Sequence, residues 1–539
     1  MFDDRGGEMA ILTEDDQAGA PAPPSRAPAM RATTSDPVAV AVHLRPAQRR
    51  GLVEHFAPTD PPPSLDVARH PFVARLLRNR RLQFLLILPN QIVFWAVILL
   101  GLLGTVVPGL NFGTAITWYL WFCLVFVMMV VVGRAWCAMC PFGGFGEWIQ
   151  RRALWRRTQK ALGLGRKLPE PIAQYGFLLS VGSFLLLTWI EETFNIAGPG
   201  APHATSWMVV GIVSSALVFF LAFERRSFCR YICPLSALIG TVGAMGSVAG
   251  FRTRDREVCV ACQTKECMRG SSSGYACPWY TWPGSADSNL TCGLCTECYK
   301  SCPSDNIGLF LQKPRTSVVA PSRRRFDVAW AVSVLWGLVV FQQVNATNVY
   351  ATADGWLNTH LHLRYPNPVD YVGIIAVVAL VMGGIAWVAQ RVLARADVAV
   401  PAGGTGYLDR TSRFRAWFVP LMYGLIPVVG ADYFARQLPK FFKHVPRLVP
   451  AIGAWFGAGS TRSSLYSYHL LANPRIVTVQ VAVIALGTLA AVSTSWRIAS
   501  RDLAPVSGRP LAVKLTAAGL ALACGLAASI LYVIMHAAS

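Results

Sequence analysis

The sequence predicts an all-α polytopic membrane protein of about nine spans, with a cysteine-rich domain inserted between its two halves. Of its 539 residues, 53% are hydrophobic and 14% are charged, and the mean hydropathy is +0.42. A soluble chain carries more charge, about a quarter of its residues. Eight of the 14 cysteines stand in one stretch, 259–302, between the fourth and fifth apolar runs. These observations together exclude an ordinary soluble protein.

Nine apolar runs are long enough to cross about 30 Å of hydrocarbon at about 1.5 Å per helical residue. The expected partner of these runs is therefore the lipid bilayer. The runs lie near residues 83–107, 113–132, 172–190, 206–223, 327–345, 369–390, 415–435, 476–496 and 512–536.

The net charge of +21 does not predict nucleic-acid binding, because most of the Arg and Lys residues flank the apolar runs. Charges in these positions indicate which loops are cytoplasmic. Loop 133–171 is rich in Arg and Lys, whereas 191–205 has neither. Because basic loops stay in the cytoplasm, the first loop and the cysteine-rich domain are expected there, with Arg323, Arg324 and Arg325 anchoring the next span. Segment 436–475 fits less well, because it should be external and yet is basic. Its short apolar run, 448–458, can lie on or dip into the membrane.

The chain divides into four expected parts. Residues 1–70, rich in Pro, Ala and Asp, are expected to form a disordered cytoplasmic tail. Residues 71–251 hold four spans as two hairpins, each followed by a cysteine pair and a proline. Residues 252–325 form the cysteine-rich domain, and 326–539 form a C-terminal module of about five spans.

The eight cysteines have the spacing of iron–sulfur ligands. They read Cys259-x2-Cys262-x4-Cys267-x9-Cys277-Pro278 and Cys292-x2-Cys295-x2-Cys298-x3-Cys302-Pro303. The second run has the spacing of bacterial ferredoxins, which hold 4Fe–4S clusters, and the x2, x2, x3 run followed by proline is unlike the two knuckles of a zinc site. Two clusters are expected. By the ferredoxin rule the fourth cysteine of each motif serves the other cluster. The expected sets are Cys259, Cys262, Cys267 and Cys302, and Cys292, Cys295, Cys298 and Cys277.

Two further cysteine pairs lie where a hairpin meets the cytoplasm, Cys137/Cys140 and Cys229/Cys233. Three interpretations stay open for these four thiols: a site for a soft metal such as Cu(I), a redox-active dithiol, or small buried side chains that only shape the junction. The four can converge if the two hairpins pack about a pseudo-twofold axis.

These motifs resemble the membrane polyferredoxins related to accessory proteins of nitrous oxide reductase and periplasmic nitrate reductase, and to the cytochrome oxidase assembly factor that reduces copper. The resemblance covers about residues 80–315. It implies two 4Fe–4S clusters on the cytoplasmic side of the bacterial inner membrane, and electron movement between the quinone pool or a cytoplasmic donor and a periplasmic or metal-centre acceptor. Such families place three residues between the membrane-edge cysteines, as in Cys229 and Cys233; Cys137 and Cys140 have two.

The C-terminal half adds His360, His362, His444 and His469 on expected external loops, where solvated histidines are more common than ligands. Electron transfer with a redox partner protein or a quinone is the first functional hypothesis. An assembly factor that reduces or delivers copper through Cys137, Cys140, Cys229 and Cys233 is the second. A redox sensor is the third.

Overall fold

The computed structural model describes residues 64–155, 162–197, 203–321, 324–361, 368–394 and 413–537. Residues 1–63 of the expected tail, Arg323 and His362 lie outside these ranges. Within them the chain is mostly helical, and nine helices are long and apolar enough to cross a membrane, as expected. The first four are α3 (Leu82–Leu103), the continuous run of α4, η5 and α5 (Phe112–Val132), α9 (Gly176–Thr193) and α10 (Ala204–Ala222).

The second half supplies the other five spans. The seventh is longer than expected, because α19 and α20 join at Gly424–Leu425 and the helix continues to His444 instead of ending near residue 435. The five are α16 (Phe326–Val344), α18 (Pro368–Leu393), α19 and α20 (Arg413–Gly424 and Ile426–His444), α23 (Asn473–Ile498) and α24 (Pro510–Ala537).

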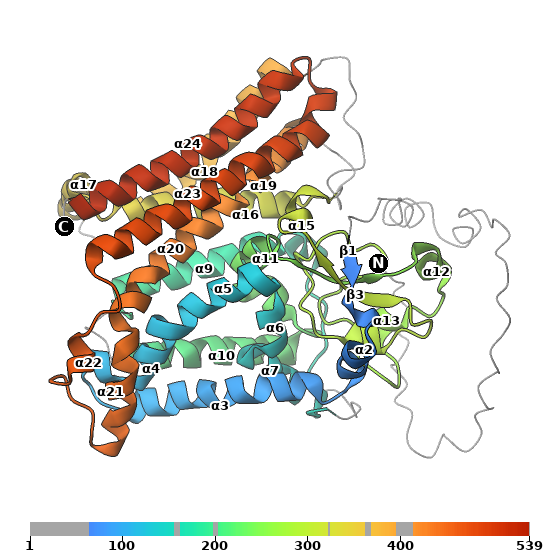
Figure 1. The fold of residues 1–539 in the computed structure, drawn as a ribbon, viewed down its shortest axis with the longest axis horizontal. Helices are drawn as coiled ribbons and strands as arrows, with labels where there is room; N and C mark the ends of the chain where they lie inside the picture. Colours follow the sequence, from blue (N-terminus) through green and yellow to red (C-terminus); the bar gives the residue numbers. More distant parts are fainter. Residues whose placement is uncertain are drawn as a thin grey trace.

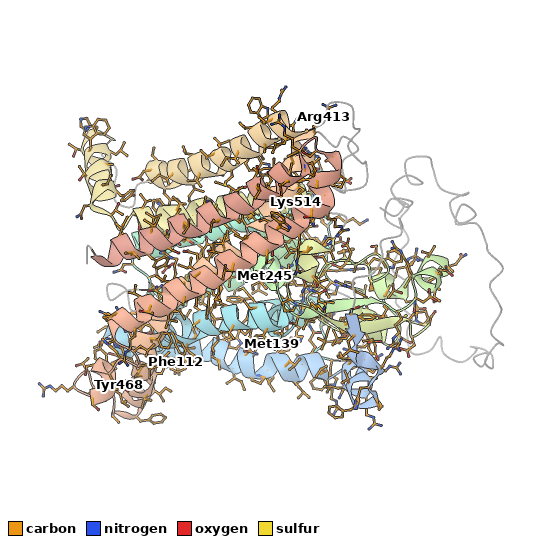
Figure 2. The ribbon with its side chains drawn as sticks, turned by 45° about the horizontal axis from the view of Figure 1, so that its top comes forward. Phe112, Met139, Met245, Arg413, Tyr468 and Lys514 are labelled. Carbon is orange, nitrogen blue, oxygen red and sulfur yellow. The ribbon has the colours of Figure 1, made fainter. Side chains whose placement is uncertain are left out.

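The spans lie side by side, with the cysteine-rich domain at one end of them (Figure 1). α17 (Asn348–Leu361), α21 (Leu448–Gly453) and α22 (Ser464–Ser467) lie at the opposite end. Phe112 and Tyr468 mark that far end in Figure 2. α16 and the α19–α20 span form the centre, since 72% and 89% of their apolar windows are buried, against 33–39% for the other spans. The outer spans expose rows of large apolar side chains, as lipid-facing helices do.

The cysteine-rich domain is built on a small antiparallel sheet in the order β1-β3-β2. β2 (Val248–Thr253) and β3 (Ile307–Gln312) come from its two ends, so they close the domain on itself. β1 (Ser64–Asp66) pairs with the free edge of β3. This pairing corrects the expected tail boundary at residue 70, because residues 64–70 are ordered against the domain. It also puts the chain before the first span on the same side as the domain after the fourth.

Short helices connect the spans to this domain. They are α2 (Pro71–Arg78), α6 (Ala135–Met139), α7 (Pro141–Arg151), α8 (Glu170–Ala173), the π-helix η6 (Phe228–Ile232), α11 (Ser236–Gly243) and α15 (Thr316–Val319).

The basic segment 436–475, which was expected to be external, lies at the far end. Its charges make contacts within the chain: Lys440 pairs with Glu191 at 3.4 Å, and Arg447 donates to the Tyr466 carbonyl. The expected short apolar run 448–458 contains α21.

Each of the two hairpins contributes a buried arginine that binds the junction of the other hairpin. Arg134 and Arg226 each stand three residues before the first cysteine of their own pair. Arg226 donates to the carbonyl of Cys137 at 2.7 Å and to the carboxylate of Glu147, both in the first hairpin's junction. Arg134 donates in the other direction, to Ser236 after the second pair. The arginines at equivalent positions of the two repeats thus each stabilise the junction that follows the other repeat.

Glu147 is the carboxylate on which this exchange depends. Its side chain is 4% exposed and pairs with Arg226, which is 1% exposed, and with Arg151. Burial by itself raises the pKa of Glu147, but the charges of Arg151 and Arg226 outweigh it and hold the pKa below its usual value. The carboxylate is therefore charged at neutral pH.

We expect Glu147→Ala to destabilise the protein by about 3–5 kcal/mol, because the buried charge of Arg226 loses its partner. The measurement is a denaturant titration of the detergent-purified chain. Glu170→Ala removes an exposed glutamate from α8 and should stay within about 0.5 kcal/mol of the unaltered protein. Equal stability of both variants would contradict the role given to the pair.

Candidate functional site

Four of the eight cysteines converge on one small cavity. Cys259 lies on α12 (Arg256–Ala261), Cys262 directly follows that helix, and Cys267 lies on α13 (Glu266–Arg269). Cys302 arrives from the second motif. All four line the same cavity, together with Trp282 and Ile307. This is the set that the ferredoxin rule groups around one cluster.

Local hydrogen bonds hold these sulfurs in place. Asp255 caps the start of α12 by accepting from the N–H of Glu257. Asn306 donates its backbone N–H to Cys302 Sγ at 3.3 Å, and its side-chain amide lies 3.4 Å from Cys259 Sγ. Thr253 Oγ1 is 3.0 Å from the same Cys259 sulfur. One asparagine after the second motif thus joins cysteines from both motifs, and the sequence analysis did not single it out.

The electrostatics of this set suit ligands of a cationic group. Burial raises the pKa of Cys262, but the N–H of Lys265 and the Thr264 side chain outweigh it and hold the pKa below its usual value. Burial raises the pKa of Cys267 to about 12, and the nearby charges of Cys259 and Cys302 add to the shift. Four thiolates crowd together at low cost only when a metal group neutralises them.

The other four cysteines form a second, deeper set. Burial raises the pKa of Cys295 and Cys298 well above the usual value, and the charge of Cys277 adds to both shifts. Cys298 also interacts with Cys295 and Cys292, so all four lie within electrostatic range. Cys277 and Cys295 belong to the apolar core of the spans, whereas Cys298 belongs to a separate core in the domain together with Cys259 and Cys267. The second set therefore bridges the two cores, and only its members Cys277 and Cys295 pack with the spans.

Two glycines leave room for this set. Gly250 has φ +89°, and a Cβ there would lie 3.0 Å from Cys292 Sγ. A Cβ on Gly293 would lie 2.0 Å from the indole nitrogen of Trp279, whose ring stacks under Arg134. Larger residues at either position would move the cysteine loop.

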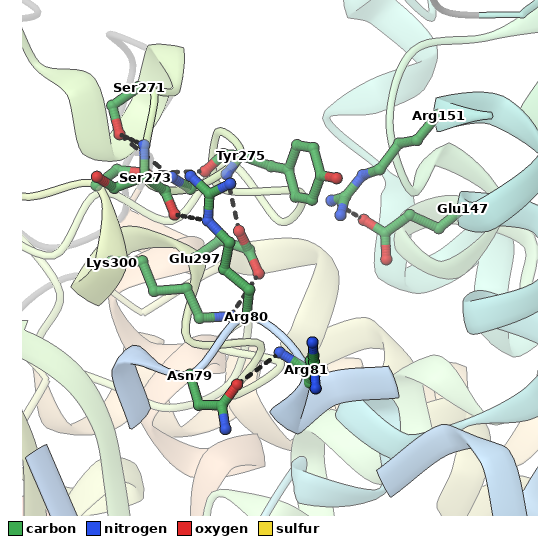
Figure 3. Close-up of polar contacts among 12 residues, drawn as sticks. Asn79, Arg80, Arg81, Glu147, Arg151, Ser271, Ser273, Tyr275, Glu297 and Lys300 are labelled. Atoms are coloured by element: carbon green, nitrogen blue, oxygen red, sulfur yellow. Dashed lines mark hydrogen bonds and ion pairs between the residues drawn. The ribbon is translucent and has the colours of Figure 1, made fainter. Parts of the chain in front are cut away.

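The long spacing between Cys267 and Cys277 is a closed loop. The N–H of Cys277 donates to the carbonyl of Cys267 at 3.0 Å, so the nine intervening residues return to their starting point. Figure 3 shows how the loop is held. Tyr275 donates its N–H to Glu297 at 2.7 Å, and Arg151 of α7 lies over its ring. Arg80, before the first span, donates to the Ser273 carbonyl.

The donors in both sets are cysteine thiolates. Among the described residues, no three His, Cys, Asp or Glu side chains are close enough to hold one metal ion. Zinc would need four sulfurs at about 2.3 Å from one centre. Cysteine thiolates at ferredoxin spacing are the ligand type of 4Fe–4S clusters, which supply one-electron chemistry when bound.

The four junction cysteines also come together. Cys229 interacts electrostatically with Cys233, Cys140 and Cys137, and Cys233 with the latter two. Cys137 and Cys229 are buried, and Cys140 and Cys233 are half-buried. The convergence expected from the repeat therefore holds in the described structure. Arg134, Arg226 and Glu147 around them were not proposed as site residues, although the equal offset of the two arginines was a signal for them.

The histidines do not come together as ligands. His360 lies on helix α17, not on a loop as expected, and its ring stacks on exposed Trp356. His444 ends α20 and packs against Tyr119. His469 lies in the connection between α22 and α23. His444 and His469 lie within electrostatic range of each other, but among the described residues no histidine belongs to a group of three potential metal ligands.

Comparison with known proteins supports an iron–sulfur protein. A family described as a 4Fe-4S binding domain matches residues 114–161 and 205–250, the two repeats that carry the junction cysteines. An uncharacterized protein of Methanocaldococcus jannaschii is 25% identical over 195 residues, which cover 34% of this chain and 75% of that protein. No solved structure matches. The relation to the reductase accessory proteins and the copper-reducing assembly factor stays a prediction.

Single substitutions should separate the two cysteine sets. Cys302→Ser is expected to disturb the same cluster as Cys259→Ser, and Cys277→Ser the same cluster as Cys292→Ser, because each pair belongs to one set. Electron paramagnetic resonance of the reduced variants should give one residual spectrum within a set and a different one between sets. Cys123→Ser, a buried cysteine outside both sets, is the control. If the residual spectrum of Cys302→Ser matched that of Cys292→Ser, the grouping would be wrong.

Proposed function

We propose that the chain is an electron-transfer protein of the bacterial cytoplasmic membrane that holds two 4Fe–4S clusters on its cytoplasmic side. The observation that carries the proposal is the cavity lined by Cys259, Cys262, Cys267 and Cys302. Its cysteines come from both motifs, as the ligands of a two-cluster ferredoxin do. A zinc ribbon would instead keep each knuckle pair together at one ion.

The burial of the two sets gives the order in which electrons pass. Cys262 and Cys302 are half-buried at the domain surface, where a soluble donor or acceptor can approach. Cys277 and Cys295 are buried in the core shared with the spans. The interaction between Cys267 and Cys277 connects the two sets. The outer set therefore serves the cytoplasmic partner, and the inner set serves the membrane.

A quinone is the membrane partner that the spans support. A shallow, open groove on the surface of α3 is lined by apolar side chains of that one helix and by Gln91. The Gln91 amide is buried, and neither its oxygen nor its nitrogen has a partner among the described residues. Turned toward the groove, this amide would offer both a donor and an acceptor to a quinone. α3 also packs against α6, which carries Cys137.

The proposed orientation follows from the span count. Nine crossings within the described residues would put residue 537 on the side opposite the cluster domain, and the basic loops support a cytoplasmic position for that domain. Alkaline phosphatase fused after residue 537 should be active in the periplasm, and a fluorescent protein fused there should stay dark. A fluorescent protein fused before residue 64 should be bright. A bright C-terminal fusion would contradict this topology.

Electron transfer is tested with the full chain in lipid nanodiscs. Dithionite should bleach the visible absorbance of the clusters, and a soluble quinone analogue should restore it. Gln91→Leu should slow the recovery by up to about tenfold, the equivalent of one hydrogen bond, and leave bleaching unchanged. Asn90→Leu alters the neighbouring amide, which bonds the Leu86 carbonyl, and is the matched control.

The results separate the two parts of this proposal. A chain with Cys259→Ser and Cys292→Ser should lose the visible absorbance of both clusters. Purified protein with neither visible absorbance nor iron would contradict the electron-transfer function. Equal recovery in Gln91→Leu and Asn90→Leu would contradict the quinone groove alone.

A further inference from the structure

We propose that Asp432 on α20 is a proton-binding site inside the membrane, which holds its proton at neutral pH and exchanges it with the face opposite the cluster domain. The inference goes beyond electron transfer and gives the C-terminal spans a chemical role. It stands on the geometry of Asp432 and its partner Gln343 of α16, both at 0% exposure. An ionisable side chain within a span is costly to bury and therefore points to a functional site.

The hydrogen bond between these two side chains leaves one acceptor unpaired on each. Gln343 donates from Nε2 to Asp432 Oδ1 at 2.6 Å. Asp432 Oδ2 and Gln343 Oε1 are both buried, and neither has a partner among the described residues. Both atoms are acceptors while the carboxyl is ionised. A proton on Oδ2 makes that atom a donor, and a carboxylic acid and a primary amide can then join through two hydrogen bonds. A single proton thus supplies the bond that both atoms lack.

The charges around Asp432 also favour the neutral acid. The titratable and charged groups in electrostatic range of its carboxyl are Arg436 and Tyr433 of the same helix and Tyr532 of α24. Tyrosine hydroxyls are neutral at pH 7. Arg436 is also in range of Glu192, at the end of α9. One guanidinium thus faces two carboxyls, and a proton on the more deeply buried one, Asp432, balances the charge of this group.

A row of polar side chains connects this site with the far face. Gln342, which precedes Gln343 on α16, donates to Glu192 Oε1 at 3.3 Å. Glu192 Oε2 is buried and has no partner among the described residues. The side chain of the adjacent Glu191 is 22% exposed. Carboxyls therefore stand at both ends of the row, and the route from the surface to Asp432 runs along α16, which packs against both α9 and α20.

In the other direction, Asp432 lies close to the helix that follows the second cysteine pair. Gly430, two residues before Asp432, packs against α11. A Cβ on Gly430 would lie 3.2 Å from Val242 Cγ2 and 3.0 Å from Met245 Cε. The carboxyl therefore lies between α11 and the far face. A proton that enters from the far face would reach the part of the bundle that adjoins the cluster domain.

The test is infrared difference spectroscopy of the full chain in lipid nanodiscs at neutral pH, with potassium as the added cation. Asp432→Asn should lose one carboxylic-acid carbonyl band relative to the unaltered protein. Asparagine copies the shape and the hydrogen bonds of the neutral acid, so this variant should fold. Asp327→Asn is the matched control. Asp327 is also buried on α16 but pairs with Arg325 at 2.7 Å, so it is ionised and contributes no such band.

Two further variants test the hydrogen bond and the route. Gln343→Leu removes the amide that donates to Asp432 Oδ1, so the carbonyl band should move to higher frequency. Glu192→Gln should slow the exchange of the Asp432 proton for deuterium. Glu170→Gln alters an exposed glutamate of α8 and should leave the exchange unchanged.

Several outcomes would overturn the proton site. An Asp432→Asn spectrum that loses no carbonyl band, or a variant chain that does not fold, would contradict a neutral acid. A band that disappears when sodium replaces potassium would assign the site to a metal cation instead. Equal exchange in Glu192→Gln and Glu170→Gln would contradict the route to the far face. None of these results depends on iron content, so the electron-transfer function is tested separately.

Discussion

The exchange of Arg134 and Arg226 between the hairpins is the interaction on which the centre of this structure depends. Both side chains are almost fully buried. An unpaired guanidinium in such a place would cost several kcal/mol, so each must find partners across the repeat. Arg226 finds Glu147, and Arg134 finds carbonyls of Ser236 and Leu290. Because the partners are in the other hairpin and in the cluster domain, the three parts can only assemble together.

The cysteine sets impose a second mutual dependence. Cys302 completes the set of the first motif, and Cys277 lies with the second. Under the proposed grouping, neither motif supplies all four ligands of a cluster by itself. Burial raises the pKa of several of these thiols, so thiolates at neutral pH require a bound cation. Folding of the domain and loading of its metal are expected to be one coupled event.

Much of this arrangement could be predicted from local sequence. Span number follows from hydropathy, and the expected cysteine grouping follows from spacing, because both signals lie within short stretches. The strand Ser64–Asp66 could not be predicted, since three residues carry no periodicity and pair with β3 far along the chain. The π-turn at Cys229 could not be predicted either. The Cys229/Cys233 pair has one more intervening residue than the Cys137/Cys140 pair, and only the fold shows that a π-turn accommodates it. The site residues Asn306 and Glu147 act through long-range contacts that spacing does not encode.

The C-terminal spans have a physical role in the proposed electron path, although the resemblance to polyferredoxins does not extend to them. Arg315, at the end of the cluster domain, donates to the Ala490 carbonyl of α23, and Arg324 pairs with Asp502 beyond that helix. On the other side, Arg225 donates to the Cys277 carbonyl at 2.8 Å. The domain is thus held from both membrane modules. Electron transfer between centres requires a fixed separation, and a domain clamped on two sides keeps its inner cysteines beside the junction thiols.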